Sequence, residues 1–169
     1  MGNSLIPDLS FPRRIHVLGI GGAGMSAIAE VLVSMGHFVT GSDLKESANL
    51  ERLRALGIVV NVGHDPKNIG DVELITRSTA VPDSNVECQE ALERRIPLLS
   101  RAEILASICE ERSTVVISGT HGKTTTSSML ALILRTSELE PSFIIGGDVN
   151  EVGTGAAWSD GQLFVVEGD

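Results

Sequence analysis

The chain has 169 residues, of which 42% are hydrophobic and 21% charged, and its formal net charge is −9 at pH 7. This composition excludes disordered, collagen-like and coiled-coil proteins, and the acidic excess argues against a general nucleic-acid binder, which needs a broad cationic surface. Cys88 and Cys109 have no metal-ligand or redox spacing, and we find neither a signal peptide nor a membrane span. We therefore expect a cytoplasmic globular protein.

Short apolar runs alternate with amphipathic segments in the first part of the chain. The pattern predicts strands at residues 14–20, 37–40, 58–62, 72–76 and 97–99, and helices at 25–35, 50–56, 86–94 and 102–109. This alternation predicts an α/β fold with a parallel sheet.

The apolar pattern breaks after residue 110, and a second unit begins there. It contains a predicted strand at 114–118, a helix at 124–134, and apolar runs at 143–145 and 163–166. We predict a Rossmann-like domain at residues 1–110 and the beginning of a P-loop domain at residues 111–169. The second segment is shorter than the ~100 residues that a complete domain of this kind usually needs, so we expect it to be truncated.

The first glycine-rich loop, GIGGAG at Gly19–Gly24, follows the first predicted strand and opens the first helix. In this G-x-G-x-x-G pattern the glycines allow a tight turn, approach of the backbone to an anion, and close helix–strand packing. Asp43 lies 19 positions beyond Gly24, where dinucleotide-binding folds place a ribose-binding carboxylate. The pattern predicts a diphosphate site; a glycine turn that only permits tight packing is the alternative.

The second loop, GTHGKTTT at Gly119–Thr126, also follows an apolar strand and begins a helix. Backbone N–H groups of such a loop can hold phosphates, Lys123 can reach the β and γ oxygens, and the Thr124 hydroxyl can bind Mg²⁺. The loop is shorter than the general P-loop, because Ile117 stands where that motif has a glycine. Glu167 is a candidate second magnesium ligand. These residues predict a nucleoside triphosphate site, with a Gly/Thr-rich helix cap as the alternative.

Together these motifs resemble the Mur ligases of bacterial peptidoglycan synthesis, over the whole length of the chain. The matching segments are GIGGAGMS (Gly19–Ser26), GSD (Gly41–Asp43), Gly63–His64, RSTAVPDSN (Arg77–Asn85), IPLLSRAEIL (Ile96–Leu105), GTHGKTTT (Gly119–Thr126), IIGG (Ile144–Gly147) and VVEGD (Val165–Asp169). Within the family, His121 favours the alanine-adding branch or the relative that recycles murein tripeptide. The glycine-rich first loop favours the alanine-adding branch.

The resemblance implies that the first domain binds the UDP part of UDP-N-acetylmuramate and not NAD. The implied contacts are Gly21, Gly22, Ala23, Gly24, Met25, Ser26, Asp43, His64, Ser78, Thr79 and Arg101. The resemblance also implies an ATP site made of Gly119, Thr120, His121, Gly122, Lys123, Thr124 and Thr125. In that site Lys123 and His121 are the implied catalytic residues, and Thr124 and Glu167 the implied ligands of Mg²⁺.

The activity implied is ATP-dependent joining of L-alanine to the lactyl carboxylate of UDP-N-acetylmuramate, through an acyl phosphate. In complete Mur ligases a third domain binds the amino acid, so we expect this chain alone to bind nucleotides with little turnover. An NAD-dependent dehydrogenase and a noncatalytic nucleotide-binding module are the alternatives, and the dehydrogenase leaves the second loop unexplained. No nucleic-acid or membrane partner is expected, and His16 and His37 are interpreted as structural.

Overall fold

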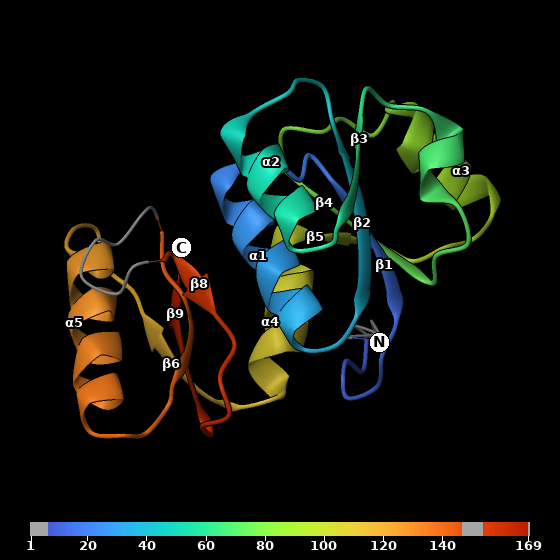
Figure 1. The fold of residues 1–169 in the computed structure, drawn as a ribbon. Coiled ribbons are helices and arrows are strands. Elements are labelled where there is room, and N and C mark those ends of the chain that lie inside the picture. The colour runs from blue at the N-terminus through green and yellow to red at the C-terminus, as the bar shows by residue number, and fades with distance from the viewer. Residues whose placement is uncertain (1–6, 147–153, 169) are drawn as a thin grey trace. The chain divides into compact units, whose positions relative to one another are not determined.

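The computed structural model describes residues 7–146 and 154–168. Gly147 and Asp169, which end two of the motifs above, lie outside the described residues. The chain divides into two compact units, Met1–Ile108 and Cys109–Asp169 (Figure 1). Within the described residues, no helix combines the length and the apolar character needed to cross a bilayer.

The first unit contains a five-stranded sheet in which every pairing is parallel. Its strands are β1 (Arg14–Leu18), β2 (Phe38–Asp43), β3 (Val59–Val62), β4 (Leu74–Arg77) and β5 (Leu98–Ser100). Their order, β3-β2-β1-β4-β5, shows that the chain adds strands first on one side of β1 and then on the other. This doubly wound topology confirms the predicted Rossmann-like sheet, and it opens a crevice at the carboxyl ends of β1 and β4.

Helices pack on both faces of this sheet. They are α1 (Ala23–Ser34), α2 (Ala48–Ala55), the short 3₁₀ helix η1 (Pro66–Ile69), α3 (Val86–Glu93) and α4 (Arg101–Glu110). Figure 1 shows α1 and α2 on one side of the sheet and α3 on the other. Side-chain caps start several of them: Asn85 accepts from the N–H of Glu87 at the start of α3, and Ser100 and Glu103 form a reciprocal capping box at α4.

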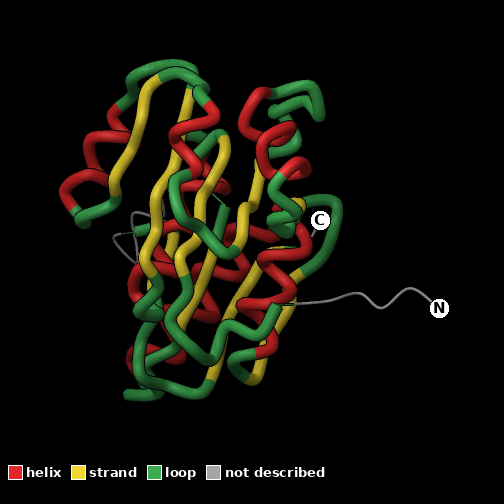
Figure 2. The backbone as a smooth tube through the Cα atoms, turned by 90° about the vertical axis from the view of Figure 1, so that its right-hand side faces the viewer, coloured by secondary structure: helices red, strands yellow, loops and turns green. Residues whose placement is uncertain are grey.

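The second unit has a four-stranded sheet in the order β6-β9-β7-β8. Its strands are β6 (Ser113–Ile117), β7 (Ser142–Ile144), β8 (Ala156–Ala157) and β9 (Leu163–Glu167), and its helix is α5 (Lys123–Thr136). β8 runs antiparallel to β7, and the other pairings are parallel. Ala131 of α5 packs with Phe143, Ile145 and Val165 in the buried core of this unit. Figure 2 distinguishes the helices, strands and loops of both units.

Every predicted strand and helix is present, with ends that differ by a few residues. β1 ends at Leu18 and not at residue 20, because Gly19, with φ of 72°, turns the chain into the glycine-rich loop. The sequence did not predict η1 or β8. Two alanines after a glycine-rich stretch show no apolar periodicity, so β8 is defined only by its pairing with β7.

Candidate functional site

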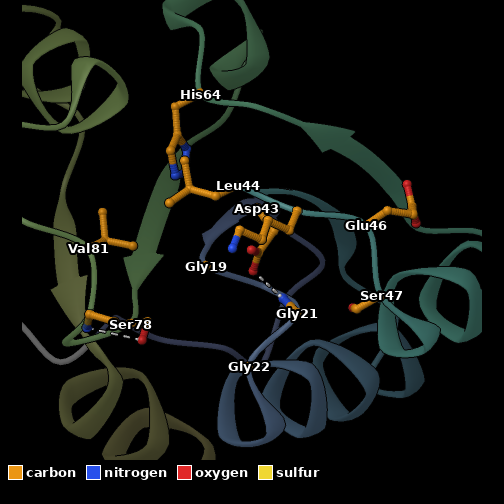
Figure 3. A pocket seen from close by; sticks show the side chains of 12 residues that line it. Gly19, Gly21, Gly22, Asp43, Leu44, Glu46, Ser47, His64, Ser78 and Val81 are labelled. Atoms are coloured by element: carbon orange, nitrogen blue, oxygen red, sulfur yellow. Dashed lines mark hydrogen bonds between the residues drawn. The ribbon is translucent and has the colours of Figure 1, made fainter.

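A cleft of about 470 Å³ lies beside the carboxyl ends of β1, β2 and β4 in the first unit (Figure 3). Its lining comes from the loops that follow four strands: Gly19, Gly21, Gly22, Asp43, Leu44, Lys45, Glu46, Ser47, His64, Ser78, Ala80 and Val81. The fold thus brings the first glycine-rich loop together with Asp43, His64 and Ser78. Open parallel α/β sheets bind ligands at this position, where the strand order reverses.

Residues at the end of β2 hold the glycine-rich loop in place. The N–H groups of Gly19 and Ile20 donate to the carbonyl oxygen of Ser42, at 2.9 and 3.1 Å. The N–H of Gly21 donates to Asp43 Oδ2 at 2.8 Å, shown as a dashed line in Figure 3. One carboxylate oxygen of Asp43, Oδ2, therefore fixes the loop.

The N-terminus of α1 is the part of this region whose backbone groups are suited to an anion. The first N–H groups of a helix, here those of Ala23 and Gly24, have no acceptor within the helix. The N–H groups of Met25 and Ser26 donate to the carbonyl oxygen of Gly22, at 3.0 and 2.8 Å, and both residues are buried. Met25 and Ser26 therefore stabilise the helix start, whereas Ala23 and Gly24 present donors to an anion.

Arg101 adds a cationic group at the same helix start. A Cβ atom on Gly24 would lie 2.8 Å from Arg101 Nε, so the guanidinium lies directly against the first turn of α1. The sequence pattern assigned this third glycine to helix–strand packing. In the structure the close neighbour is the Arg101 side chain instead. A guanidinium beside free N–H groups is suited to a phosphate.

A buried carboxylate that the sequence analysis did not identify supports the wall of the cleft. Glu87, in the first turn of α3, is fully buried. It accepts hydrogen bonds from Ser42 Oγ (2.6 Å), Asn68 Nδ2 (2.6 Å) and the Asp65 N–H (3.1 Å). Burial by itself raises the pKa of Glu87, but the nearby His16 imidazole and hydrogen bonds from Ser42 and Asn68 outweigh it and lower the pKa to about 2. The carboxylate is therefore ionised.

The other predicted residues of this unit lie in different environments. Ser78 lines the cleft, whereas Thr79 is exposed and is not among the lining residues. His16 is buried in β1, with Nδ1 2.7 Å from Thr40 Oγ1. His37 is also buried, and its Nδ1 accepts from the N–H of Arg13 at 3.1 Å. These contacts agree with the structural interpretation of both histidines.

The second glycine-rich loop connects β6 to α5. Gly119, with φ of 154°, and Gly122, with φ of 78°, adopt conformations that favour glycine. Lys123 Nζ donates to the Gly119 carbonyl oxygen at 2.9 Å, so the lysine folds back along the loop. The first N–H groups of α5, including those of Thr124 and Thr125, lack acceptors within the helix. Thr120, His121, Thr124 and Thr125 are all exposed. The loop thus offers backbone donors and one ammonium group to a phosphate.

Glu167 lies beside this loop at the end of β9. It is paired in register with Ile117, the last residue of β6. Its Oε1 is buried without a hydrogen-bond partner, and a Cβ on Gly146 would lie 2.9 Å from its Oε2. A buried carboxylate oxygen without a protein donor is unfavourable, which leaves this oxygen to a cation, a proton or a water molecule.

Hydroxyl and carboxylate oxygens are ligands of the kind that Mg²⁺ takes. Among the described residues, no group of three or more His, Cys, Asp and Glu side chains could hold a metal ion. Mg²⁺, however, commonly takes one or two protein ligands together with phosphate and water oxygens. A hydroxyl and a carboxylate, the side chains predicted at Thr124 and Glu167, would be such a partial set.

Comparison with known proteins identifies relatives of both units. The profile of the Mur ligase family, catalytic domain, matches residues 14–113. A UDP-N-acetylmuramate–L-alanine ligase from Allorhizobium ampelinum is 52% identical over 155 residues, which cover 92% of this chain and 33% of that protein.

Two solved structures share the fold over nearly the whole chain. The UDP-N-acetylmuramate-alanine ligase of Thermotoga maritima has a TM-score of 0.83 and 31% identity, and the match covers 92% of this chain and 37% of that one. A murein peptide ligase from Psychrobacter arcticus has a TM-score of 0.83 and 25% identity, over 93% of this chain and 38% of that one. The chain therefore spans about a third of the length of the curated relatives it matches.

Proposed function

Because the chain belongs to the Mur ligase family, we propose that it carries the sugar-nucleotide and ATP-binding loops of a cytoplasmic ligase that joins L-alanine to UDP-N-acetylmuramate. Residues 1–110 bind the UDP-sugar, and residues 111–169 begin the ATP-binding domain. The observation that carries this proposal is the presence in one chain of two glycine-rich helix N-termini, each with its own cationic side chain, Arg101 in one and Lys123 in the other.

The cleft of the first unit is suited to a UDP-sugar. The N–H groups of Ala23 and Gly24, with the Arg101 guanidinium, hold the diphosphate. Asp43 Oδ1 and His64 contact the nucleoside, and Ser78 with its neighbour Thr79 borders the sugar-nucleotide. Since the loop binds through backbone groups and one guanidinium, an overall acidic chain can still hold the two negative charges of a diphosphate.

The second loop is suited to ATP. Its backbone N–H groups and Lys123 hold the phosphates, and His121 orients the reacting groups. Thr124 and Glu167 hold Mg²⁺, which when bound neutralises charge on the phosphates. The lactyl carboxylate attacks the γ-phosphorus, forming an acyl phosphate and releasing ADP. The amine of L-alanine then displaces phosphate and forms the amide. The chain's own residues position the groups and neutralise the phosphoryl charge, with Lys123 in the central role.

A murein peptide ligase is the second candidate within the family. The fold does not separate the two, because the structural relatives of both activities have the same TM-score. Sequence identity supports the alanine ligase, at 52% for the relative from Allorhizobium ampelinum. A dehydrogenase would leave the loop at Gly119–Thr126 without a role.

Calorimetric titration of the chain with UDP-N-acetylmuramate, NADH and a nonhydrolysable Mg-ATP analogue tests this function. We expect the sugar nucleotide to bind and NADH not to bind. Arg101→Ala should weaken sugar-nucleotide binding, while Arg94→Ala, which removes an exposed arginine from the end of α3, should not. Binding of NADH without binding of UDP-N-acetylmuramate would refute the proposal.

A further inference from the structure

The imidazole of His64 lies at the cleft wall with one ring nitrogen held from behind. Its side chain is 11% exposed, and Figure 3 shows the ring pointing into the pocket from the loop after β3. Nδ1 lies 3.1 Å from Ser42 Oγ and 3.3 Å from Glu87 Oε2. Because Nδ1 is engaged on the protein side, Nε2 is the ring nitrogen left for a ligand.

The neighbours of Nδ1 determine which nitrogen carries the proton. The Ser42 hydroxyl has one hydrogen, and it donates that hydrogen to Glu87 Oε2 at 2.6 Å. The ionised carboxylate of Glu87 can only accept. Neither neighbour can therefore donate to Nδ1, so Nδ1 must itself be the donor. A neutral imidazole has one N–H, which leaves Nε2 with a lone pair.

We propose that Glu87 is a positioning residue that holds His64 in the Nδ1–H tautomer and presents Nε2 to the cleft as a hydrogen-bond acceptor. Glu87 is itself fixed on its other side. Its Oε1 accepts from the Asp65 N–H at 3.1 Å and from Asn68 Nδ2 at 2.6 Å. The Asn68 amide group cannot flip without losing a hydrogen bond, because Nδ2 also donates to the Gly63 carbonyl oxygen at 3.1 Å.

His16 is the other titratable group beside this carboxylate. Its Nε2 lies 3.5 Å from Glu87 Oε2, and its Nδ1 lies 2.7 Å from Thr40 Oγ1. It sits in the middle of β1 and is fully buried, so it has no path to the ligand. His16 therefore lies beside Glu87 without reaching the cleft, whereas His64 contacts Glu87 and also lines the cleft.

An acceptor at this position selects a donor on the ligand. This step rests on the proposed function, under which the ligand is a UDP-sugar. The nucleoside of UDP offers two kinds of donor, the ribose hydroxyls and the imide N–H of uracil. Inverting the acceptor to an N–H would leave two donors facing each other only at the imide N–H, because a ribose hydroxyl can rotate and accept instead. The group that Nε2 selects is therefore the imide N–H of uracil.

Glu87→Gln tests the positioning role without changing side-chain shape. The Asp65 N–H and the Asn68 amide can only donate to the new side chain, so its oxygen must stay toward them. Its NH₂ group then faces Ser42 and His64, and His64 Nδ1 can accept only if the ring proton moves to Nε2. We expect the variant to switch the tautomer.

Two-bond ¹H–¹⁵N correlation spectra at pH 8.5, where an ordinary imidazole with a pKa of about 6.5 is neutral, identify the protonated nitrogen. We expect Nδ1–H in the parent chain and Nε2–H in Glu87→Gln. Glu93→Gln makes the same change on the exposed end of α3 and should leave the parent tautomer, as should Ser42→Ala, because the carboxylate remains. An Nε2–H or doubly protonated His64 in the parent chain, or an unchanged tautomer in Glu87→Gln, would overturn the proposal.

Titration with UDP separates this proposal from the proposed function. Glu87→Gln should bind UDP about tenfold more weakly than the parent chain. 3-Methyl-UDP, which lacks the imide N–H, should bind equally to both chains, whereas 2′-deoxy-UDP should retain the difference; the reverse pattern would refute the imide contact. A switched tautomer with unchanged UDP affinity would refute the role of Nε2 in binding. Absence of UDP binding to the parent chain would refute the proposed function, while the spectra would still decide the tautomer.

Discussion

Replacing Gly24 by alanine should weaken UDP binding without weakening the fold. The added Cβ would lie 2.8 Å from Nε, 3.1 Å from Cζ and 3.2 Å from Nη2 of Arg101. These atoms belong to the end of a flexible side chain, so we expect the guanidinium to move and α1 to stay in place. Alanine also favours a helix over glycine, by about 1 kcal/mol in a helix interior. The free energy of unfolding should therefore stay level or rise slightly.

The expected loss of affinity follows from the size of this displacement. Ordinary contacts between nonbonded atoms begin near 3.5 Å, so Nε must move by roughly 0.7 Å or more. A shift of this size disturbs the paired hydrogen bonds that a guanidinium makes to a phosphate. A hydrogen bond to a charged group contributes about 1.5–3 kcal/mol, and losing one corresponds to about a 10- to 100-fold increase in Kd.

A double-mutant cycle isolates the contact between the two residues. Calorimetric titration with UDP and thermal unfolding are measured for Gly24→Ala, Arg101→Ala and the double variant. In the Arg101→Ala background, Gly24→Ala should change Kd by less than about twofold, because the group that it displaces is gone. An equal loss of affinity in both backgrounds, or a fall in Tm that accompanies it, would show that the alanine acts through the helix and not through Arg101.

Three further variants or conditions test other parts of the structure. Lys123→Ala should weaken binding of a Mg-ATP analogue at least about tenfold and leave UDP binding unchanged, because Lys123 belongs to the second loop alone; parallel titrations check this, and an equal loss for both nucleotides would contradict it. Gly41→Ala should lower the free energy of unfolding by roughly 2–3 kcal/mol, because its Cβ would lie 2.5 Å from Ile20 Cδ1 and 2.8 Å from the Val17 carbonyl oxygen. Urea unfolding measures this change, and a loss below about 1 kcal/mol would be inconsistent with the contacts. The pKa of Glu87 is lowered from 4.5 to about 2, so the stability that it provides is present above pH 4.5 and is lost as the pH falls toward 2. Urea unfolding across this range should show that the free energy of unfolding falls by up to about 3 kcal/mol. In Glu87→Gln this dependence on pH should largely disappear.

The fold was predictable because its determinants are local. Alternating apolar and amphipathic segments define the strands and helices, and the pattern at Gly19–Gly24 marks the first strand–helix turn. The strand order is not encoded by any local pattern, since β4 pairs with β1 through residues that lie 59 positions apart in the sequence. β8 escaped prediction for the same reason, because its residues, Ala156 and Ala157, are defined by their partner strand.

The residues of the candidate site also fall into those that the sequence identifies and those that it does not. Glycines, Asp43 and Lys123 stand at fixed spacings from recognisable strands, so sequence alone identifies them. Sequence alone does not identify Glu87, because an acidic residue in the first turn of a helix is common and is explained by its interaction with the helix dipole. Its partners come from β1, β2 and the segment after β3, which only the folded chain brings together. The contact between Gly24 and Arg101 is equally long-range.

The carboxylates beside the two loops differ in how their oxygens are satisfied, and this difference predicts what each can bind. Protein donors surround both oxygens of Glu87, so its negative charge is compensated within the fold and it has no need of a cation. Asp43 accepts from the N–H of Gly21 with one oxygen, and the proposed function assigns its second oxygen to the nucleoside. Glu167 has a buried oxygen without a protein donor, so this oxygen is left to a cation, a proton or a water molecule. Under the proposals above, the same side-chain chemistry fixes a tautomer in one place, contacts a nucleoside in the second and binds a magnesium ion in the third. Counting donors distinguishes these proposed roles where residue type does not.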